Sequence, residues 1–243
     1  MKKALSSMPF TRLALFAWGI LTLTLTGCLD KDKDTAEPAK VAFVSFYHGS
    51  PDAPDLDILI NSQRLNVLPF KYSDHSNYLS FLPGSRRIKF TPVNASNAYI
   101  DTALTFQVDK AYSLFVVDKL QQMDILVVKD SLVTPAAGNA RVRIINLSPD
   151  SPEVDLASTG TSNTTLFSNL SFKEDSEFKE VTAGTYNFQI KKSGSADVVL
   201  SVPNVDLVAG RNFTLLFRGF GTPPAGNTKT LSLQVVQAQL AGN

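Results

Sequence analysis

Alternation of apolar and polar residues dominates the chain from about residue 40 onwards. In Thr185–Ile190, for example, Tyr186, Phe188 and Ile190 fall on one face of an extended segment. Clusters of Ser, Pro, Asp, Asn and Gly separate most of these segments, as turns would. The pattern predicts strands at Val41–Tyr47, Leu56–Ile60, Ser76–Phe81, Arg86–Thr91, Ile100–Phe106, Ala111–Val117, Met123–Val128, Thr185–Ile190, Asn212–Phe217 and Leu231–Val236.

About seven short strands with frequent turns in roughly a hundred residues are typical of a β-sandwich. Alternation of this kind fits antiparallel sheets that bury one face. We therefore expect an all-β fold of two tandem immunoglobulin-like or prealbumin-like β-sandwiches.

An internal duplication sets the domain organisation. Three segments recur at offsets of 98, 100 and 101 residues: His48–Asp57 as Asn146–Asp155, Leu82–Ser85 as Thr182–Thr185, and Lys110–Val116 as Arg211–Phe217. A period near one hundred indicates two copies of one domain. The predicted boundaries are repeat 1 at 40–133, a linker at 134–139 and repeat 2 at 140–239. The loop 221–227 is longer than its counterpart in repeat 1, and so is a place where the copies can differ in function.

The first residues have the parts of an export signal. A basic start precedes the apolar run Leu13–Leu25, which is too short to span a bilayer comfortably. Leu25-Thr26-Gly27-Cys28 follows and resembles the lipobox of bacterial lipoproteins. The resemblance implies a signal peptide over 1–27, cleavage before Cys28 and lipidation of Cys28 with acyl chains such as palmitate. An ordinary signal peptide with a coincidental Cys is the alternative.

Composition narrows the location and the partners. The charged stretch within 28–39 predicts a flexible tether. With the lipobox, this predicts a lipid-anchored protein of the cell envelope, at the periplasmic or surface face of the outer membrane. The formal net charge is only +1, so we expect no nucleic-acid partner. The single Cys excludes an intrachain disulfide.

A repeated Ser-Pro-Asp-x-Pro segment is the most specific motif of the body. Pro fixes φ, and an Asp carboxylate can cap nearby backbone N–H groups, so the motif predicts a braced turn. The bracing residues are His48, Ser50, Pro51, Asp52 and Pro54 in repeat 1 and Ser148, Pro149, Asp150 and Pro152 in repeat 2.

A calcium site built on Asp52, Asp55 and Asp57 is the alternative for this motif, although it lacks the Gly-punctuated calcium loop. Asp57 and its counterpart Asp155 alternate with apolar neighbours, as outward-facing strand positions would.

Catalysis finds little support. His48 and His75 could be imagined in a triad, but there is no G-x-S-x-G elbow, and Asn146 replaces His48 in repeat 2. A position that accepts both His and Asn is better explained as a hydrogen bonder. We expect no enzyme activity, no cofactor and no metal.

The motifs His48-x-Ser-Pro-Asp-Ala-Pro and, in repeat 2, Gly184-Thr185-Tyr186 resemble the bacterial domain-of-unknown-function family 4397. The resemblance covers about 41–238 and departs at Arg86, where the family has Tyr. It implies exported sandwich domains without enzyme activity.

Three functions remain open on these grounds. The first is a non-catalytic module that binds a protein, glycan or matrix partner at the envelope. The second is a structural spacer or subunit of an envelope complex with no dedicated ligand. The third, a hydrolase, is disfavoured. Tyr72 and Tyr99 lie beside turn signals and are the aromatic residues most expected at the surface.

Overall fold

Sixteen strands and one short 3-10 helix make up the part of the chain that the computed structural model describes, residues 39–159 and 163–238. The first eight strands are β1 (Ala42–His48), β2 (Leu56–Ile60), β3 (Gln63–Arg64), β4 (Leu79–Phe81), β5 (Gly84–Pro92), β6 (Ile100–Phe106), β7 (Ala111–Val117) and β8 (Asp124–Asp130). The other eight are β9 (Asn139–Asn146), β10 (Val154–Thr159), β11 (Thr164–Leu170), β12 (Lys179–Thr182), β13 (Gly184–Lys192), β14 (Val198–Leu207), β15 (Asn212–Arg218) and β16 (Ser232–Ala238). The helix η1 spans Leu120–Gln122, between β7 and β8.

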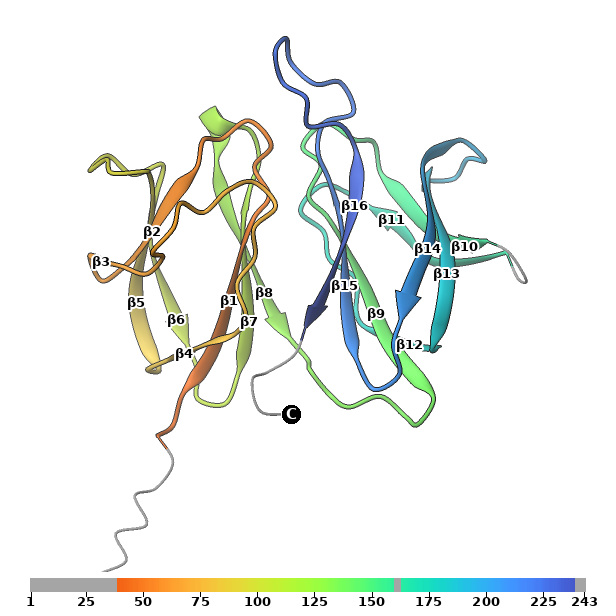
Figure 1. The fold of residues 1–243 in the computed structure, drawn as a ribbon, viewed down its shortest axis with the longest axis horizontal. Helices are drawn as coiled ribbons and strands as arrows, with labels where there is room; N and C mark the ends of the chain where they lie inside the picture. Colours follow the sequence, from red (N-terminus) through yellow and green to blue (C-terminus); the bar gives the residue numbers. More distant parts are fainter. Residues whose placement is uncertain (1–38, 160–162, 239–243) are drawn as a thin grey trace, which may run out of the picture. The chain divides into compact units, whose positions relative to one another are not determined.

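These strands form four sheets of four strands (Figure 1). Sheets β3–β2–β5–β6 and β4–β1–β7–β8 make the first sandwich, module 1. Sheets β11–β10–β13–β14 and β12–β9–β15–β16 repeat this order in module 2. We call β4–β1–β7–β8 and β12–β9–β15–β16 the facing sheets, because they pack against each other, and the other two the outer sheets.

Each sandwich has its own apolar core, because alternate residues of both sheets point inward. In module 1 the fully buried residues Phe46, Phe90 and Leu114 come from β1, β5 and β7. In module 2 Ile144 and Phe188 come from β9 and β13.

A further apolar cluster joins the two facing sheets. Its buried members are Tyr47, Phe115, Val117 and Val128 from module 1 and Ile145, Leu147 and Leu216 from module 2. Every residue of β7 is buried as a result. The described residues accordingly belong to one compact unit, within Ala39–Asn243.

One pairing in each module differs from the purely antiparallel sheets that the sequence predicts. β1 runs parallel to β7, and β9 runs parallel to β15. Between β1 and β7 the chain crosses to the outer sheet for β2 and β3, returns for β4, and crosses again for β5 and β6. No hairpin therefore joins β1 to β7, and they are free to run parallel.

The all-β class with two tandem sandwiches is confirmed. The ten strands assigned from the sequence all appear, with shifts of up to three residues at their ends. The connection between β8 and β9 covers 131–138. The predicted domain boundaries stay a prediction.

Candidate functional site

The signature turn of module 1 lies directly after β1. His48 and Ser50 are fully buried, and Pro51 is buried as well. The Nε2 group of His48 donates to the Pro54 carbonyl oxygen over 3.2 Å, which ties the two ends of the turn together. Asp52 is half-buried and Pro54 is exposed.

The corresponding turn of module 2 is tied by an amide. Asn146 donates from Nδ2 to the Leu170 carbonyl oxygen at 3.0 Å, and its Oδ1 accepts the Ser148 N–H at 3.0 Å. Ser148 is fully buried, Pro149 is half-buried, and Asp150 and Pro152 are exposed. An amide therefore occupies the place of an imidazole and makes more hydrogen bonds there.

The two signature aspartates reach across to another loop, whereas the sequence predicts caps on nearby backbone. Asp52 Oδ1 accepts the backbone N–H of Leu120 at 2.8 Å, at the start of η1. Asp150 accepts the N–H groups of Gly221 and Thr222 at 2.7 and 3.0 Å. In both modules the carboxylate thus joins the loop after the first strand to the loop before the last strand. Their contribution to stability stays a prediction.

The acidic residues that could have held calcium have other partners or are exposed. Asp57 lies between the core residues Leu56 and Ile58 and so on the outward face of β2, but it is only 5% exposed because neighbouring groups cover it. It forms an ion pair with Arg64 (Nη2 to Oδ1, 2.7 Å) and accepts the Asn94 N–H at 2.9 Å. Asp55 is exposed. Within residues 39–159 and 163–238, no group of three or more His, Cys, Asp or Glu could hold a metal ion.

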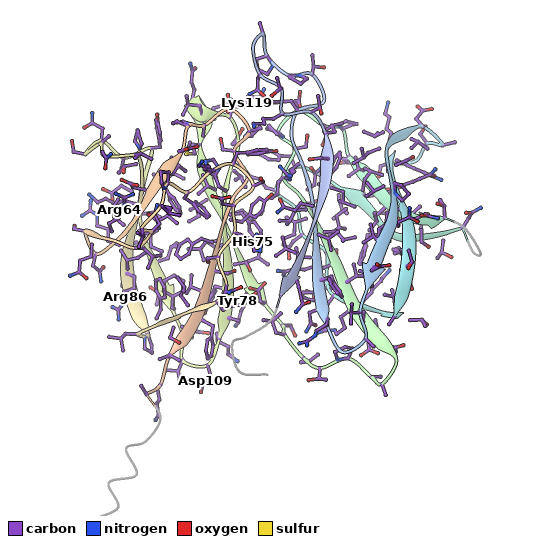
Figure 2. All side chains as sticks on the ribbon, in the orientation of Figure 1. Arg64, His75, Tyr78, Arg86, Asp109 and Lys119 are labelled. Atoms are coloured by element: carbon purple, nitrogen blue, oxygen red, sulfur yellow. The ribbon has the colours of Figure 1, made fainter. Side chains whose placement is uncertain are left out.

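The surroundings of His48 disfavour its charged form. Burial lowers its pKa, and the hydrogen bond to the Pro54 carbonyl opposes that shift only in part. His75 is exposed and pairs through its backbone with Tyr47 (Figure 2). Neither imidazole is described in contact with a Ser and an Asp, as a triad would require.

Module 2 extends its long loop over the signature turn of module 1. Gly219 (φ +92°) opens this loop, where a Cβ would come within 2.1 Å of the Thr230 carbonyl oxygen. Asn227 Nδ2 donates to the Pro51 carbonyl oxygen at 3.0 Å. An open concavity of about 450 Å³ lies between Pro51–Ala53 and Pro224–Lys229. The loop that differs between the copies is therefore part of the contact between modules.

Each module also has an open concavity at the same place in its sandwich. That of module 1 measures about 470 Å³ and that of module 2 about 250 Å³. The repeat offsets align Ile60 with Ser158 and Leu82 with Thr182. Arg64 and Arg86 border the first concavity on the outer side of module 1 (Figure 2). Ser158, Thr159, Thr182, Thr185 and Tyr186 line the second.

A buried polar cluster between the facing sheets escaped the sequence analysis. Asp130 on β8 and Arg143 on β9 form an ion pair at 2.6 Å, with side chains 0% and 3% exposed. Asp130 Oδ2 also accepts the hydroxyl groups of Tyr78 and Ser113 at 2.6 and 2.7 Å. The Arg143 guanidinium lies 4.6 Å from the centre of the Phe178 ring.

The sequence carries a signal for this interface. Strands β7 and β15 carry apolar residues at odd and even positions alike, and so on both faces. Their sequences are Ala-Tyr-Ser-Leu-Phe-Val-Val and Asn-Phe-Thr-Leu-Leu-Phe-Arg. Such runs are typical of strands buried on both faces. They indicate that a second layer covers the facing sheets.

The two tyrosines expected at the surface, Tyr72 and Tyr99, differ in how far they are exposed. Tyr99 is 39% exposed. Tyr72 is half-buried, and Arg218 and Lys229 of module 2 lie 4.9 and 5.5 Å from its ring centre. Burial raises the pKa of Tyr72, although the positive charge of Arg218 acts in the opposite direction. Tyr72 is thus part of the contact between modules.

One family model matches part of this chain. Residues 42–157 match a family model described as "Domain of unknown function (DUF4397)". The match covers module 1 and ends in β10, and it supports the resemblance drawn from the sequence. Resemblance of the remainder of module 2 to this family stays a prediction.

Among solved structures, the carbohydrate-binding module CBMbc (family CBM26) of Eubacterium rectale Amy13K, in complex with maltoheptaose, is similar at 8% identity. The alignment covers 82% of this chain and 98% of that chain, with a TM-score of 0.26. A TM-score this low carries no information on function. The comparison with curated proteins gives no match.

Cys28 and the tether lie outside the described residues. Across the described ranges, no helix is long and apolar enough to cross a membrane.

Proposed function

We propose that this chain is a non-catalytic binding protein, held at the cell envelope by lipid on Cys28, that presents its two modules to a protein, glycan or matrix partner. The observation that supports it best is the pair of concavities at equivalent positions. Duplication gave both modules the same hollow, and their linings have since diverged. Loops that differ between copies are where binding specificity arises.

The two linings suit different parts of a partner. In module 1, Leu65 and Leu82 are 36% and 66% exposed, and Arg64 and Arg86 stand beside them. This mixture suits an apolar group next to an anionic or hydrogen-bonding one. In module 2, hydroxyl groups and the Tyr186 ring form the lining, which suits a neutral hydroxylated ligand such as a glycan.

Filling each concavity tests this function. Leu82→Trp and Thr182→Trp place the same bulk at equivalent, exposed positions. Val208→Trp, at a position 58% exposed after β14, is the matched control. Binding of the full chain to envelope polysaccharide fragments and to purified envelope proteins is measured by calorimetry. We expect each filling variant to weaken binding of one probe at least tenfold, while the control leaves it unchanged. A probe that binds all three variants equally would refute the concavities as binding sites.

Anchoring is tested separately. Cys28→Ala leaves the sulfur-borne lipid without an attachment point, so we expect an unprocessed precursor. The unsubstituted protein is expected to enter the detergent phase after phase separation, because each buried CH₂ of an acyl chain contributes about 0.8 kcal/mol. Mature unsubstituted protein found wholly in the aqueous phase would contradict the anchor and the proposed envelope location.

A structural spacer or complex subunit is the second candidate. The cluster shared by the facing sheets favours it, because it holds the two modules together as a spacer requires. Val67 and Leu68, 91% and 77% exposed after the short edge strand β3, would suit assembly with another protein. Under this function no probe binds, and disruption of the interface between modules releases the protein from its complex.

A further inference from the structure

The facing sheets are related by an approximate two-fold symmetry. The repeat offset of 101 aligns Ser113 with Thr214. Ser45 pairs with Ser113 in module 1, and Arg143 pairs with Thr214 in module 2, so Ser45 and Arg143 are equivalent. In the same way, Asp130 pairs with Ala111 in module 1 and Ala238 pairs with Asn212 in module 2. Asp130 and Ala238 are therefore equivalent.

Contacts across the interface consequently occur in pairs. Arg143 meets Asp130 on one side, and Ser45 and Ala238 line one small cavity of about 40 Å³ on the other. A space of this size holds a few water molecules.

The two members of each pair have different chemistry. Tyr47 of module 1 donates its hydroxyl to Gln234 Oε1 of module 2 at 2.7 Å. Their equivalents, Ile145 and Leu126, belong to the apolar cluster between the sheets. In each pair, therefore, one contact is polar and its equivalent across the two-fold is apolar or small, and the polar contact lies on a different side in the two pairs. The modules have become complementary to each other and have ceased to be identical.

Shape follows the same rule at the signature turns. Gly49 and Leu147 are equivalent, and each belongs to the turn that follows the first strand of its module. A Cβ on Gly49 would stand 3.2 Å from Leu147 Cδ1 and 3.1 Å from the Val116 carbonyl oxygen. Two copies of module 2 would bring Leu147 against Leu147, and two copies of module 1 would leave this space unfilled.

Charge makes the stronger distinction. In a pair of module 1 copies, the buried carboxylate of Asp130 would face Ser45, with no cation. In a pair of module 2 copies, Arg143 would face Ala238 and lose its ion pair, keeping only the more distant attraction of Asp175 in its own module. Removing one partner of a buried ion pair is strongly unfavourable, because the other charge stays desolvated. Unpaired charges of this kind act against wrong partners.

We infer that the two facing sheets form a heterotypic recognition surface: module 1 binds module 2 and rejects a second copy of itself, chiefly through Asp130 and Arg143. The partner that fits each surface is the other module, from the same chain or from a second chain. Two copies of the protein therefore do not join through like modules, and the concavities of one chain keep a fixed relation.

The test uses the full chain with a protease site inserted between Ala136 and Ala137, both exposed in the segment that joins the modules. The folded chain is cleaved, mixed with an isotopically heavy cleaved chain, unfolded in denaturant and refolded. Native mass spectrometry then counts the pairs. We expect complexes of module 1 with module 2, in light, heavy and mixed-isotope combinations. Like pairs, which join two copies of the same module, should form at less than a tenth of the frequency that random pairing would give.

Two double variants separate recognition from general stability. The first combines Asp130→Ala with Arg143→Ser. It replaces the ion pair by Ala and Ser, the residues found at the equivalent positions Ala238 and Ser45, so the chain is expected to fold. We expect like pairs to rise at least tenfold. Arg87→Ser with Asp101→Ala removes an ion pair of similar length, 2.6 Å, from the outer sheet, and we expect no like pairs there. Asp130→Ala alone leaves Arg143 without its carboxylate and should weaken the mixed pair more than the double variant does.

Several results would overturn the inference. Like pairs at their statistical share in the unsubstituted chain would show that the surfaces do not discriminate. Halves that separate after cleavage, or that refold without pairing, would show that the surfaces do not recognise each other. A double variant that still forms mixed pairs alone would remove the ion pair from that role.

Discussion

The outer sheets of the two modules carry different side chains on the same backbone. In module 1, Asp101 on β6 pairs with Arg87 and Lys89 on β5, at 2.6 and 3.1 Å. The strand registers place neutral residues at the same positions of module 2: Asn187, Gln189 and Ser201. Both sheets nevertheless have the same strand order. Inward apolar residues and turns are thus sufficient for the fold, and outward positions are free to change.

The signature turns teach the complementary lesson. The His48 side chain makes one hydrogen bond, to Pro54, whereas the Asn146 side chain joins Leu170 and Ser148. Both side chains are fully buried. The position therefore requires a hydrogen-bonding group that can be buried, and it does not require a group that titrates.

The largest expected effect comes from truncating the cores. Phe90 and its equivalent Ile190 are fully buried, and removing such side chains costs about 3–5 kcal/mol for Phe→Ala and about 2–5 kcal/mol for Ile→Ala. Because the facing sheets share an apolar cluster, we expect either variant to lower one common unfolding transition of the whole chain. Denaturant titration, followed by calorimetry, measures it. Two well-separated transitions, with only one of them shifted, would show that the modules unfold independently.

A smaller and asymmetric effect is expected at the signature aspartates. Asp150 accepts two backbone N–H groups and Asp52 accepts one. An amide keeps one acceptor oxygen, so Asp52→Asn should change the free energy of unfolding by less than about 0.5 kcal/mol. Asp150→Asn should lower the free energy of unfolding by about 1 kcal/mol, because one of the two backbone N–H groups then faces an amide NH₂. Thermal melts of both variants measure the difference.

The same melts separate turn bracing from a calcium site. With bracing, calcium and chelator leave the melting temperature unchanged in the unsubstituted chain and in both variants. A melting temperature that rises with millimolar calcium, and loses this response in the Asn variants, would restore the cation site. Equal losses for Asp52→Asn and Asp150→Asn would contradict the unequal hydrogen bonding.

Strand positions follow well from sequence, because each depends on local alternation and nearby turn residues. Ile100–Phe106 and Ala111–Val117, for example, are predicted with the bounds that the structure has. The parallel pairing of β1 with β7 was missed, since it depends on where the chain crosses between sheets, and no local pattern reports that.

The site was less predictable for a related reason. The aspartates of the signature turns bind loops 68 to 72 residues away, and the ion pair with Arg64 helps to cover the outward carboxylate of Asp57. The Asp130–Arg143 pair depends on how one module lies against the other. Each is a contact of a polar group with one particular partner, and hydrophobic periodicity contains no information on such partners.

His48 should make the stability of module 1 depend on pH in a way that Asn146 cannot reproduce. Burial lowers the pKa of His48 below its unfolded value of about 6.5. The unfolded chain therefore binds the proton more readily, and stability falls as the pH drops below that value. His48→Asn should remove this part of the pH dependence. Urea titrations between pH 7.5 and 5 measure the difference between the two proteins, and parallel curves over that range would contradict it.

The smallest effect is expected at the exposed ion pairs of the outer sheet. The hydrogen bond from Arg87 lowers the pKa of Asp101 to about 2. Its contribution to stability is present above the unfolded pKa of about 4 and is lost as the pH falls towards 2. Because Arg87 is 61% exposed, solvent and salt screen the pair. Asp101→Asn should therefore lower the melting temperature slightly at pH 7 and low salt, and by less at pH 2 or in 1 M salt. Ser201→Asn, at the neutral equivalent position in module 2, is the control and should show no dependence on pH or salt. An NMR titration of the Asp101 carboxyl that gives an ordinary pKa near 4 would contradict this prediction. The ion pair would then add nothing to the stability of module 1, as in module 2, which lacks it.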